Sequence, residues 1–389
     1  MSELSYLEKL LDGVEVEWLP LGEITKYEQP TKYLVKAKDY HDTYTIPVLT
    51  AGKTFILGYT NETHGIYQAS KAPVIIFDDF TTANKWVDFD FKAKSSAMKM
   101  VTSCDDNKTL LKYVYYWLNT LPSEFAEGDH KRQWISNYSQ KKIPIPCPDN
   151  PEKSLAIQSE IVRILNKFTA LTAELTAELT AELNMRKKQY NYYRDQLLSF
   201  EEGEVEWKTL GDLGENLDSK RKPITSGLRE AGSIPYYGAS GIVDYVKDYI
   251  FDGDFLLISE DGANLLARNT PIAFSISGKS WVNNHAHVIK FDSYAERRYV
   301  EYYLNSIDLS PYISGAAQPK LNKKNLESIR IPNPSPEDKE RIVSILDKFD
   351  ALTNSINEGL PREIELRQKQ YEHYRDLLFS FPKPEAASN

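Results

Sequence analysis

The chain has 389 residues, 41% hydrophobic and 26% charged, which is longer than one hydrophobic core usually supports and too apolar for a disordered protein. Its 56 acidic and 47 basic residues give a formal net charge of −9, which argues against a protein that coats nucleic acid through bulk charge. No run of about 18 apolar residues exists, and the only cysteines are Cys104 and Cys147. We therefore expect a multidomain cytoplasmic protein without a membrane span or a disulfide framework.

The first predicted domain covers residues 1–150 and contains short apolar strands separated by turns. It opens with GVEVEWLPLGEI at 13–24 and continues through TIPVLTAG, TFILGY and APVIIFDD. A helix is expected near YVYYWL at 113–118. The proline-rich stretch IPIPCPDNP at 143–151 marks the end of the domain, because proline interrupts regular structure.

Residues 151–200 predict one long amphipathic helix from about Glu152 to Leu198. Apolar residues recur at the three-to-four spacing of a helix, and neither proline nor glycine interrupts them. At 1.5 Å per residue the helix would run on the order of 65 to 70 Å. LTAELTAELTAEL at 171–183 repeats TAEL three times, and each unit advances the helix by about 6 Å, so the repeat is interpreted as a ruler. Slippage-prone sequence without a role is the alternative.

The second predicted domain covers residues 201–335 and follows the same plan. GEVEWKTLGDL at 203–213 opens it, YVEYYL at 299–304 predicts its helix, and IRIPNPSP at 329–336 closes it. His285 and His287 form a weak two-ligand metal pattern. A carboxylate-rich stretch, better explained by turns than by a nuclease metal, comprises Asp252, Asp254, Glu260 and Asp261.

A second helical segment covers residues 336–381 and precedes a tail at 382–389. IVSILDKF at 342–349 repeats IVRILNKF at 161–168, and RQKQYEHYRDLLFSF at 367–381 repeats RKKQYNYYRDQLLSF at 186–200, both 181 positions apart. Gly359 and Pro361 should kink or break this helix. The apolar stripes predict an antiparallel coiled coil with pseudo-two-fold symmetry. YLEKLLDG at 6–13 resembles the helix ends, so the repeat is circular.

The duplicated frame carries two domains whose middle parts barely match. This pattern is typical of a protein that holds both halves in one pose while they recognise different targets, and ordinary drift after duplication is the alternative. No HExxH, GxSxG, GxGxxG or Asn-Pro-Pro-Tyr-like motif occurs, which disfavours an enzyme. The fold class is therefore α+β, with two mixed, sheet-rich domains joined by two long helices.

Loops of both domains mix basic, amide, hydroxyl and aromatic side chains, which suits phosphates and base edges. The candidate DNA-binding residues of the first domain are Lys53, Tyr59, Thr81, Thr82, Asn84, Lys85, Lys92, Lys94, Lys131 and Arg132. Those of the second are Lys220, Arg221, Lys222, Tyr237, Ser240, Asn264, Arg268, Lys279, Asn283, Asn284, His285, Lys320, Lys323 and Lys324. A solvated surface role is the alternative for each. Core positions are expected for Trp86, Trp134 and Trp281. The expected spacer and subunit-contact residues are Leu171, Leu175, Leu179, Leu183, Tyr190, Tyr193, Tyr371 and Tyr374.

Over essentially its full length the chain resembles the specificity subunit of type I restriction-modification enzymes, of the type IC group. The resemblance is carried by IVRILNKFTALTAEL, by RKKQYNYYRDQLLSF and its C-terminal copy, and by ISEDGANLLARNTPIAFSISGKSWVNNHAHVI at 258–289. It implies two target-recognition domains that each read one half of a split, asymmetric site in double-stranded DNA. It also implies that the TAEL copy number alters the gap between the halves.

The resemblance further implies a non-catalytic subunit with no cofactor or metal of its own. Two modification subunits would supply S-adenosylmethionine-dependent adenine methylation on a flipped base, and restriction subunits would supply ATP-driven translocation and magnesium-dependent cleavage. A coiled-coil adaptor without DNA specificity and an isolated enzyme are the competing interpretations. The diverged domains disfavour the adaptor, and the missing motifs disfavour the enzyme.

Overall fold

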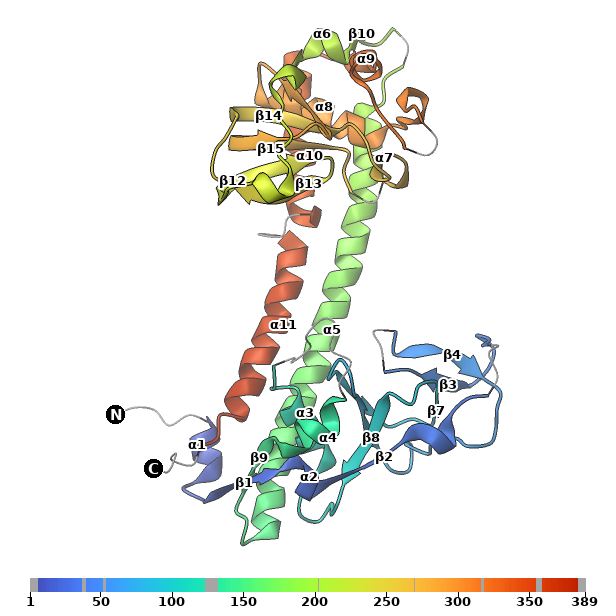
Figure 1. Ribbon diagram of the computed structural model, residues 1–389, viewed down its shortest axis with the longest axis vertical. Coiled ribbons are helices and arrows are strands. Elements are labelled where there is room, and N and C mark those ends of the chain that lie inside the picture. The colour runs from blue at the N-terminus through green and yellow to red at the C-terminus, as the bar shows by residue number, and fades with distance from the viewer. Residues whose placement is uncertain are drawn as a thin grey trace. The chain divides into compact units, whose positions relative to one another are not determined.

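The computed structural model describes residues 6–36, 40–51, 54–122, 132–201, 203–268, 270–315, 318–354 and 359–383. The chain divides into two compact units, Met1–Glu178 with Ile364–Asn389, and Leu179–Glu363 (Figure 1). The division falls within the long helix α5 (Pro151–Leu198), so this helix contributes to both units. Among the described helices, none has the length and apolar character that crossing a membrane requires.

The described residues of the first unit form three small sheets. A two-stranded sheet pairs β1 (Val16–Pro20) with β9 (Lys142–Pro146), which joins the opening and the end of the domain. An antiparallel sheet has the order β2 (Thr25–Glu28), β8 (Met98–Ser103), β5 (Val74–Asp78), β6 (Asn84–Val87). A third has the order β4 (Ile56–Thr60), β3 (Ile46–Leu49), β7 (Lys92–Ala93). The short helices are α1 (Tyr6–Leu11), α2 (Leu21–Ile24), η1 (Pro30–Tyr33), α3 (Leu111–Leu118), α4 (Gln133–Ser136) and η2 (Tyr138–Gln140).

The central strands β5 and β8 of the four-stranded sheet are buried on both faces, because their alternate side chains point to opposite faces. Ile75 and Val101 join a core with α3 and with Ile161 of α5. Ile76 and Met100 belong to a second core beside the β4-β3-β7 sheet. The sheet is therefore held between the helices and the smaller sheet, and α3 confirms the helix predicted near 113–118.

The second unit is organised around one six-stranded sheet. Its order is β11 (Glu215–Asn216), β16 (Ala286–Lys290), β14 (Phe251–Ser259), β15 (Ala273–Val282), β12 (Ala231–Gly238), β13 (Gly241–Val246). Only the β12–β15 pair in this sheet is parallel. β10 (Glu206–Thr209) and β17 (Arg330–Asn333) form a separate pair that again joins the opening and the end of the domain. The remaining short elements are α6 (Leu210–Leu213), η3 (Asp218–Lys220), η4 (Ser226–Leu228), α7 (Asn264–Ala267), η5 (Ser310–Tyr312) and α9 (Lys323–Glu327).

Helix α8 (Tyr294–Ser306) covers one face of this sheet. Its N-cap Ser293 accepts a hydrogen bond from the Glu296 backbone N–H, which satisfies one of the free donors of the first turn. Val300 packs in a core with Leu256 of β14 and Ile342 of α10 (Pro336–Asn354). The sheet is thereby fixed to the helical part of its own unit.

The long helices follow the prediction closely. α5 spans 48 residues without a break, and the second segment is divided into α10 and α11 (Gly359–Leu378), as the glycine and proline predicted. Gly359 has a φ of +78°, a left-handed conformation that favours glycine at this start.

Each unit contains an antiparallel helix pair, and a phenylalanine and a tyrosine at the same positions of the repeat stack between the two helices. In the first unit, Phe168 of α5 stacks on Tyr374 of α11 with ring centres 5.3 Å apart. In the second, Tyr193 of α5 stacks on Phe349 of α10 at 5.7 Å. The predicted antiparallel pairing is confirmed within each unit, and the pseudo-two-fold relation between the units stays a prediction.

The N-terminal helix lies at the end of α11, as the circular repeat predicts. Leu7 and Leu11 share a core with Phe379 and Phe381, and the indole N–H of Trp18 donates to the Pro382 carbonyl at 2.9 Å. The helix at 6–11 and the residues that follow α11 therefore pack together within the first unit.

Candidate nucleic-acid interface

The candidate DNA-binding residues of the first domain divide by exposure. Lys85, Lys94 and Arg132 are exposed, whereas Tyr59, Thr81 and Asn84 are half-buried. Lys53 and Lys131 lie outside the described residues.

Two of these candidates are not in exposed loops, contrary to the expectation. Lys92 is only 2% exposed, since it lies on strand β7. Its ammonium group donates to the His64 carbonyl at 2.6 Å and pairs with Glu62 at 3.1 Å. Thr82 is also buried, in a turn where its φ is +62°. Lys92 therefore serves to hold the 62–65 loop in place.

A buried ion pair anchors the end of the basic run at 130–134. Asp79 lies 3.3 Å from the Lys99 ammonium group, and its other oxygen accepts the Trp134 backbone N–H at 2.9 Å. The Trp134 ring is buried and packs edge-on against Phe77 at 4.9 Å. Trp134 is thus a core residue as expected, and Asp79 holds the position of exposed Arg132 beside it. Asp79 and Lys99 are not predicted from the sequence, because a charge within an apolar strand pattern does not reveal its partner.

In the second domain the structure gathers several candidates around one buried carboxylate. Glu260 pairs with Arg221 at 2.6 Å and with Lys320 at 3.0 Å. Arg221 also pairs with Asp218 at 3.2 Å and donates to the Ala286 carbonyl at 2.8 Å. The loops at 218–222, 260–264, 284–287 and 318–321 are therefore tied together at one end of the sheet. Arg221 acts within this network rather than as a free surface cation.

His287 completes this network. One ring nitrogen lies 2.6 Å from an Asp218 oxygen, and the other lies 2.7 Å from the Leu321 carbonyl. Burial alone would raise the pKa of Asp218, but its hydrogen bond to His287 and the nearby positive charges lower that pKa below its ordinary value. Burial likewise opposes ionisation of Glu260, and its bonds to Arg221 and Lys320 outweigh it and lower the pKa.

The same carboxylates and His287 lie close enough for a cation. Ligand atoms of Asp218, Glu260 and His287 are within 4.8 Å of one another. Arg221 and Lys320 already compensate both carboxylates, however, so the geometry is that of a closed ion network. His285 faces Asp261 at 2.9 Å instead of joining His287, so the two histidines of the weak metal pattern bind different carboxylates.

The other candidates of the second domain also divide by exposure. Asn283 is buried, contrary to the expectation, and its side chain accepts the His285 backbone N–H at 2.8 Å. Arg268 donates to the Ile307 carbonyl at 2.6 Å, and Asn264 bonds the Thr270 backbone. Tyr237 is half-buried and packs against Phe274. The exposed candidates are Lys220, Lys222, Ser240, Lys279, Asn284, His285, Lys320, Lys323 and Lys324.

The edge strand β13 carries an exposed apolar surface that is not predicted from the sequence. Ile242, Val243 and Tyr245 are each about half exposed. Strand alternation was the only available signal, and it does not tell an edge strand from a central one. This surface lies on the same sheet as Tyr237.

The expected spacer and contact residues lie along the long helices. Leu171 is 51% exposed, and Leu175, Leu179 and Leu183 are half-buried. Tyr190 packs near Phe349, and Tyr371 accepts a hydrogen bond from Thr169 at 3.2 Å. Beside the Phe168–Tyr374 stack an apolar groove of about 360 Å³ is lined by Tyr6, Leu7, Ile164, Phe168, Tyr374, Leu377, Leu378 and Ser380.

Comparisons with known proteins lead to one family. Residues 13–185 and 202–366 match the family model described as type I restriction modification DNA specificity domain. The chain is 68% identical to the EcoR124I/EcoR124II specificity subunit of Escherichia coli, with both chains fully covered. It is 39% identical to the EcoprrI specificity subunit of the same organism, covering 92% of this chain and 93% of that one.

Two solved structures share the fold at low sequence identity. A type I restriction-modification S subunit from M. genitalium matches with a TM-score of 0.52 and 15% identity, covering 98% of this chain and 99% of that one. A chain from a structural study of type I complex assembly matches with a TM-score of 0.56 and 15% identity, covering 94% and 97%. With matched regions in both halves and full-length relatives, the chain belongs to the specificity-subunit family of type I restriction-modification systems.

Proposed function

We propose that each domain of this specificity subunit reads one half of a bipartite, asymmetric site in double-stranded DNA. The observation that carries this proposal is the contrast between a repeated frame and unlike sheets. The Phe–Tyr stack closes the helix pair of each unit, while the sheets differ in strand number and order. Two domains with different sheets, carried on repeated helix pairs, suit a DNA site with two different halves. The alternative of an adaptor without DNA specificity is not favoured.

The repeated frame also offers two related surfaces, each beside one Phe–Tyr stack, for two copies of one partner. The side chains beside the Phe168–Tyr374 stack are apolar and partly exposed, Leu377 among them. Residues 181 positions away form the corresponding stack of the second unit. Two modification subunits, one on each surface, are the partners that fit, and restriction subunits would join them.

We assign the methylation and cleavage reactions to those partner subunits. S-adenosylmethionine-dependent adenine methylation, ATP-driven translocation and magnesium-dependent cleavage would be supplied by other chains, and this chain would hold and orient DNA in the cytoplasm. Its described buried ion networks are paired internally, which suits a structural role for them.

The TAEL units at 172–183 are proposed to set the gap between the half-sites. Each adds about 6 Å to α5, close to two base pairs of DNA at about 3.4 Å each. The test is to express the chain with its modification subunits in a methylation-free host and to map N6-methyladenine, with and without residues 176–179. A split motif that changes only its gap supports the proposal. A stably assembled complex that methylates no motif, or whose half-sites change identity, overturns it.

A further inference from the structure

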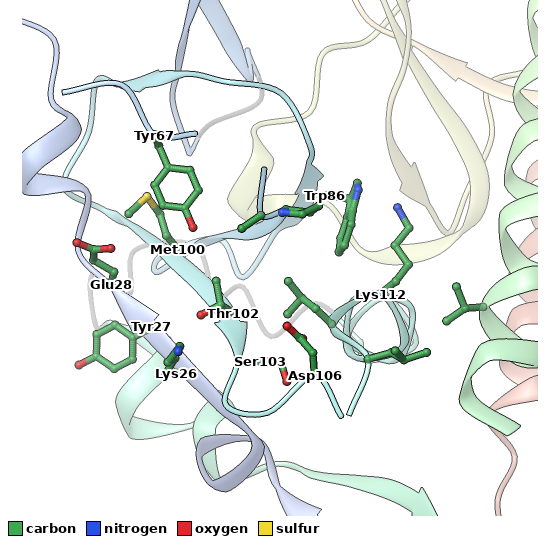
Figure 2. Close-up of a pocket in the computed structure, with 15 residues that line it drawn as sticks. Lys26, Tyr27, Glu28, Tyr67, Trp86, Met100, Thr102, Ser103, Asp106 and Lys112 are labelled. Atoms are coloured by element: carbon green, nitrogen blue, oxygen red, sulfur yellow. The ribbon is translucent and has the colours of Figure 1, made fainter. Parts of the chain in front are cut away.

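A pocket of about 790 Å³ opens in the first unit between the β2–β8 edge of the sheet and the start of α3 (Figure 2). Met100, Leu111 and Val162 give it apolar walls, and Trp86 and Lys112 lie side by side at one end (Figure 2). The Lys112 ammonium group lies 3.9 Å from the centre of the Trp86 ring. Trp86 packs against the core, as expected, and also lines this pocket.

Lys112 is half-buried without a carboxylate at ion-pair distance among the residues that the structure describes. Its neighbours are rings, since Tyr115 and Tyr116 lie 5.3 and 5.8 Å away from the ammonium group. Asp88, which accepts the Trp86 indole N–H at 3.2 Å, acts on Lys112 only from a distance. Burial lowers the pKa of Lys112 to about 8, because a desolvated ammonium group loses its hydration without gaining a counter-ion.

The second unit has a cation at the corresponding position of its own helix, with carboxylates beside it. LKYVYYWLNT at 111–120 aligns with RRYVEYYLNS at 297–306, so Arg298 occupies the position of Lys112. Arg298 pairs with Glu301 at 2.6 Å, with Asp347 at 2.9 Å and with Asp350 at 3.3 Å. Arg298 therefore shows that carboxylates can pair with a cation at this helix position.

The first unit lacks all three of those carboxylates. By the repeat, Tyr115 replaces Glu301, Asn166 replaces Asp347 and Thr169 replaces Asp350. One neighbouring contact is kept. Tyr116 donates to Asn166 at 2.7 Å, as Tyr302 donates to Asp347 at 2.6 Å.

We propose that the Lys112 pocket binds a carboxylate carried on an apolar segment of a partner protein. The carboxylate would replace the anions that the second unit supplies internally, and the apolar walls would receive the side chains beside it. The charged lining consists of Lys26 and Lys112 against Glu28 and Asp106. Since these charges cancel, the pocket has no excess positive charge for a chain of DNA phosphates, and a single carboxylate is the better match.

Binding should depend on pH. The titratable groups around Lys112 are Lys26, Tyr27 and Glu28 on β2, Tyr67, Asp88 after β6, Asp106 before α3, Tyr115 and Tyr116 on α3, and Tyr371 on α11. The carboxylate binds the protonated amine, so affinity is full below the pKa of Lys112 and falls about tenfold per pH unit above it.

The test uses the full chain labelled with ¹⁵N-tryptophan, whose Trp86 indole signal is assigned with Trp86→Phe. The probe is acetyl-Leu-Glu-Phe-amide, and its matched control is acetyl-Leu-Gln-Phe-amide. We expect the glutamate peptide to shift the Trp86 signal saturably at pH 7, and the glutamine peptide to bind at least about tenfold more weakly. Lys112→Met should weaken binding of the glutamate peptide by a similar factor, whereas Lys153→Met, on the exposed start of α5, should leave it unchanged.

Two further variants separate a binding role from a structural one. Lys112→Arg should keep the binding and remove its loss above pH 8, because arginine stays charged. The double variant Asn166→Asp with Thr169→Asp copies two of the three anions of the second unit, those at Asp347 and Asp350, and should abolish peptide binding in a folded protein. Equal binding of both peptides, or unchanged binding in Lys112→Met, overturns the proposal. It is also overturned if a DNA duplex, and not the peptide, shifts Trp86 in a Lys112-dependent way.

Discussion

The helical parts of the two units are alike, whereas the sheets they carry are unlike. The Phe–Tyr stack and the tyrosine bond to the α5 or α10 helix recur at nearly the same distances, 5.3 against 5.7 Å and 2.7 against 2.6 Å. The first unit then carries four-stranded and three-stranded sheets, and the second a six-stranded sheet with one parallel pair. Because the helix pairs are conserved while the sheets vary, the recognition surfaces can diverge without changing the helix packing that supports each domain.

The buried charges follow the same division. In the second unit Glu260 joins Arg221 and Lys320 across several loops, and in the first unit Asp79 and Lys99 anchor one loop. Neither network has a counterpart in the repeated sequence. Each therefore belongs to the divergent part of its domain, where loop positions decide what a domain can contact.

The largest expected effect comes from breaking the network of the second unit. Glu260→Gln removes the carboxylate that Arg221 and Lys320 share and leaves Arg221 with Asp218 alone in a mostly buried site, so we expect a loss of about 3 kcal/mol in unfolding free energy. Urea unfolding of the full chain, followed by the fluorescence of single-tryptophan variants that retain Trp207 or Trp134, measures it. The second unit should unfold earlier and the first should be unchanged.

Glu230→Gln is the matched control for this change. Glu230 pairs with Lys247 at 3.0 Å, but both side chains are exposed, so the loss should stay below about 1 kcal/mol. Equal losses in the two variants would contradict a structural role for the Glu260 network.

Low pH should lower the stability of the second unit as well. The pKa values of Asp218 and Glu260 are lowered in the folded state, so their contribution to stability is present above the unfolded values, about 4, and is lost as pH falls through the folded values. Unfolding free energy measured between pH 6 and pH 2 should therefore decline more steeply for the second unit in the native chain than in Glu260→Gln. Parallel declines would show that this network does not set the acid sensitivity.

Much of the frame was predictable from the sequence, because helices obey local rules. α5 begins and ends within a residue of the prediction, and the break at Gly359 follows from backbone conformation alone. The aromatic pairs also follow from the 181-residue offset. Repetition with helical periodicity is a signal that survives without any knowledge of tertiary contacts.

The candidate site was less predictable, because exposure depends on which strand lies at an edge and which loop packs over it. Lys92 looked like a loop cation, yet parallel pairing with β3 buries it. Arg221 looked like part of a basic loop, yet Glu260, 39 positions later, pairs with it. The sequence pattern does not single out Lys112. Only the comparison with Arg298 shows that Lys112 lacks carboxylate partners.

Removing one ring of the repeated stack should have an intermediate effect. Phe168→Ala and Phe349→Ala each remove an aromatic pair at a partly exposed helix surface, and we expect about 1 to 2 kcal/mol from each. If the surfaces bind two copies of one partner, each variant should retain one modification subunit. Analytical ultracentrifugation of the assembled complex distinguishes this from loss of both copies, which would contradict two independent surfaces.

The smallest expected effect tests the tyrosine bond that both units share. Tyr302→Phe removes a bond to the Asp347 carboxylate, and Tyr116→Phe removes one to the neutral Asn166 amide. Bonds to charged groups are worth about 1.5 to 3 kcal/mol and neutral ones about 0.5 to 1.5 kcal/mol, so Tyr302→Phe should cost more. Introducing Asn166→Asp should raise the cost of Tyr116→Phe toward that of Tyr302→Phe in a double-mutant cycle measured by urea unfolding. If the cycle shows no coupling, the carboxylate introduced by Asn166→Asp does not strengthen the Tyr116 hydrogen bond. The charge of the acceptor would then not account for the difference between the two units.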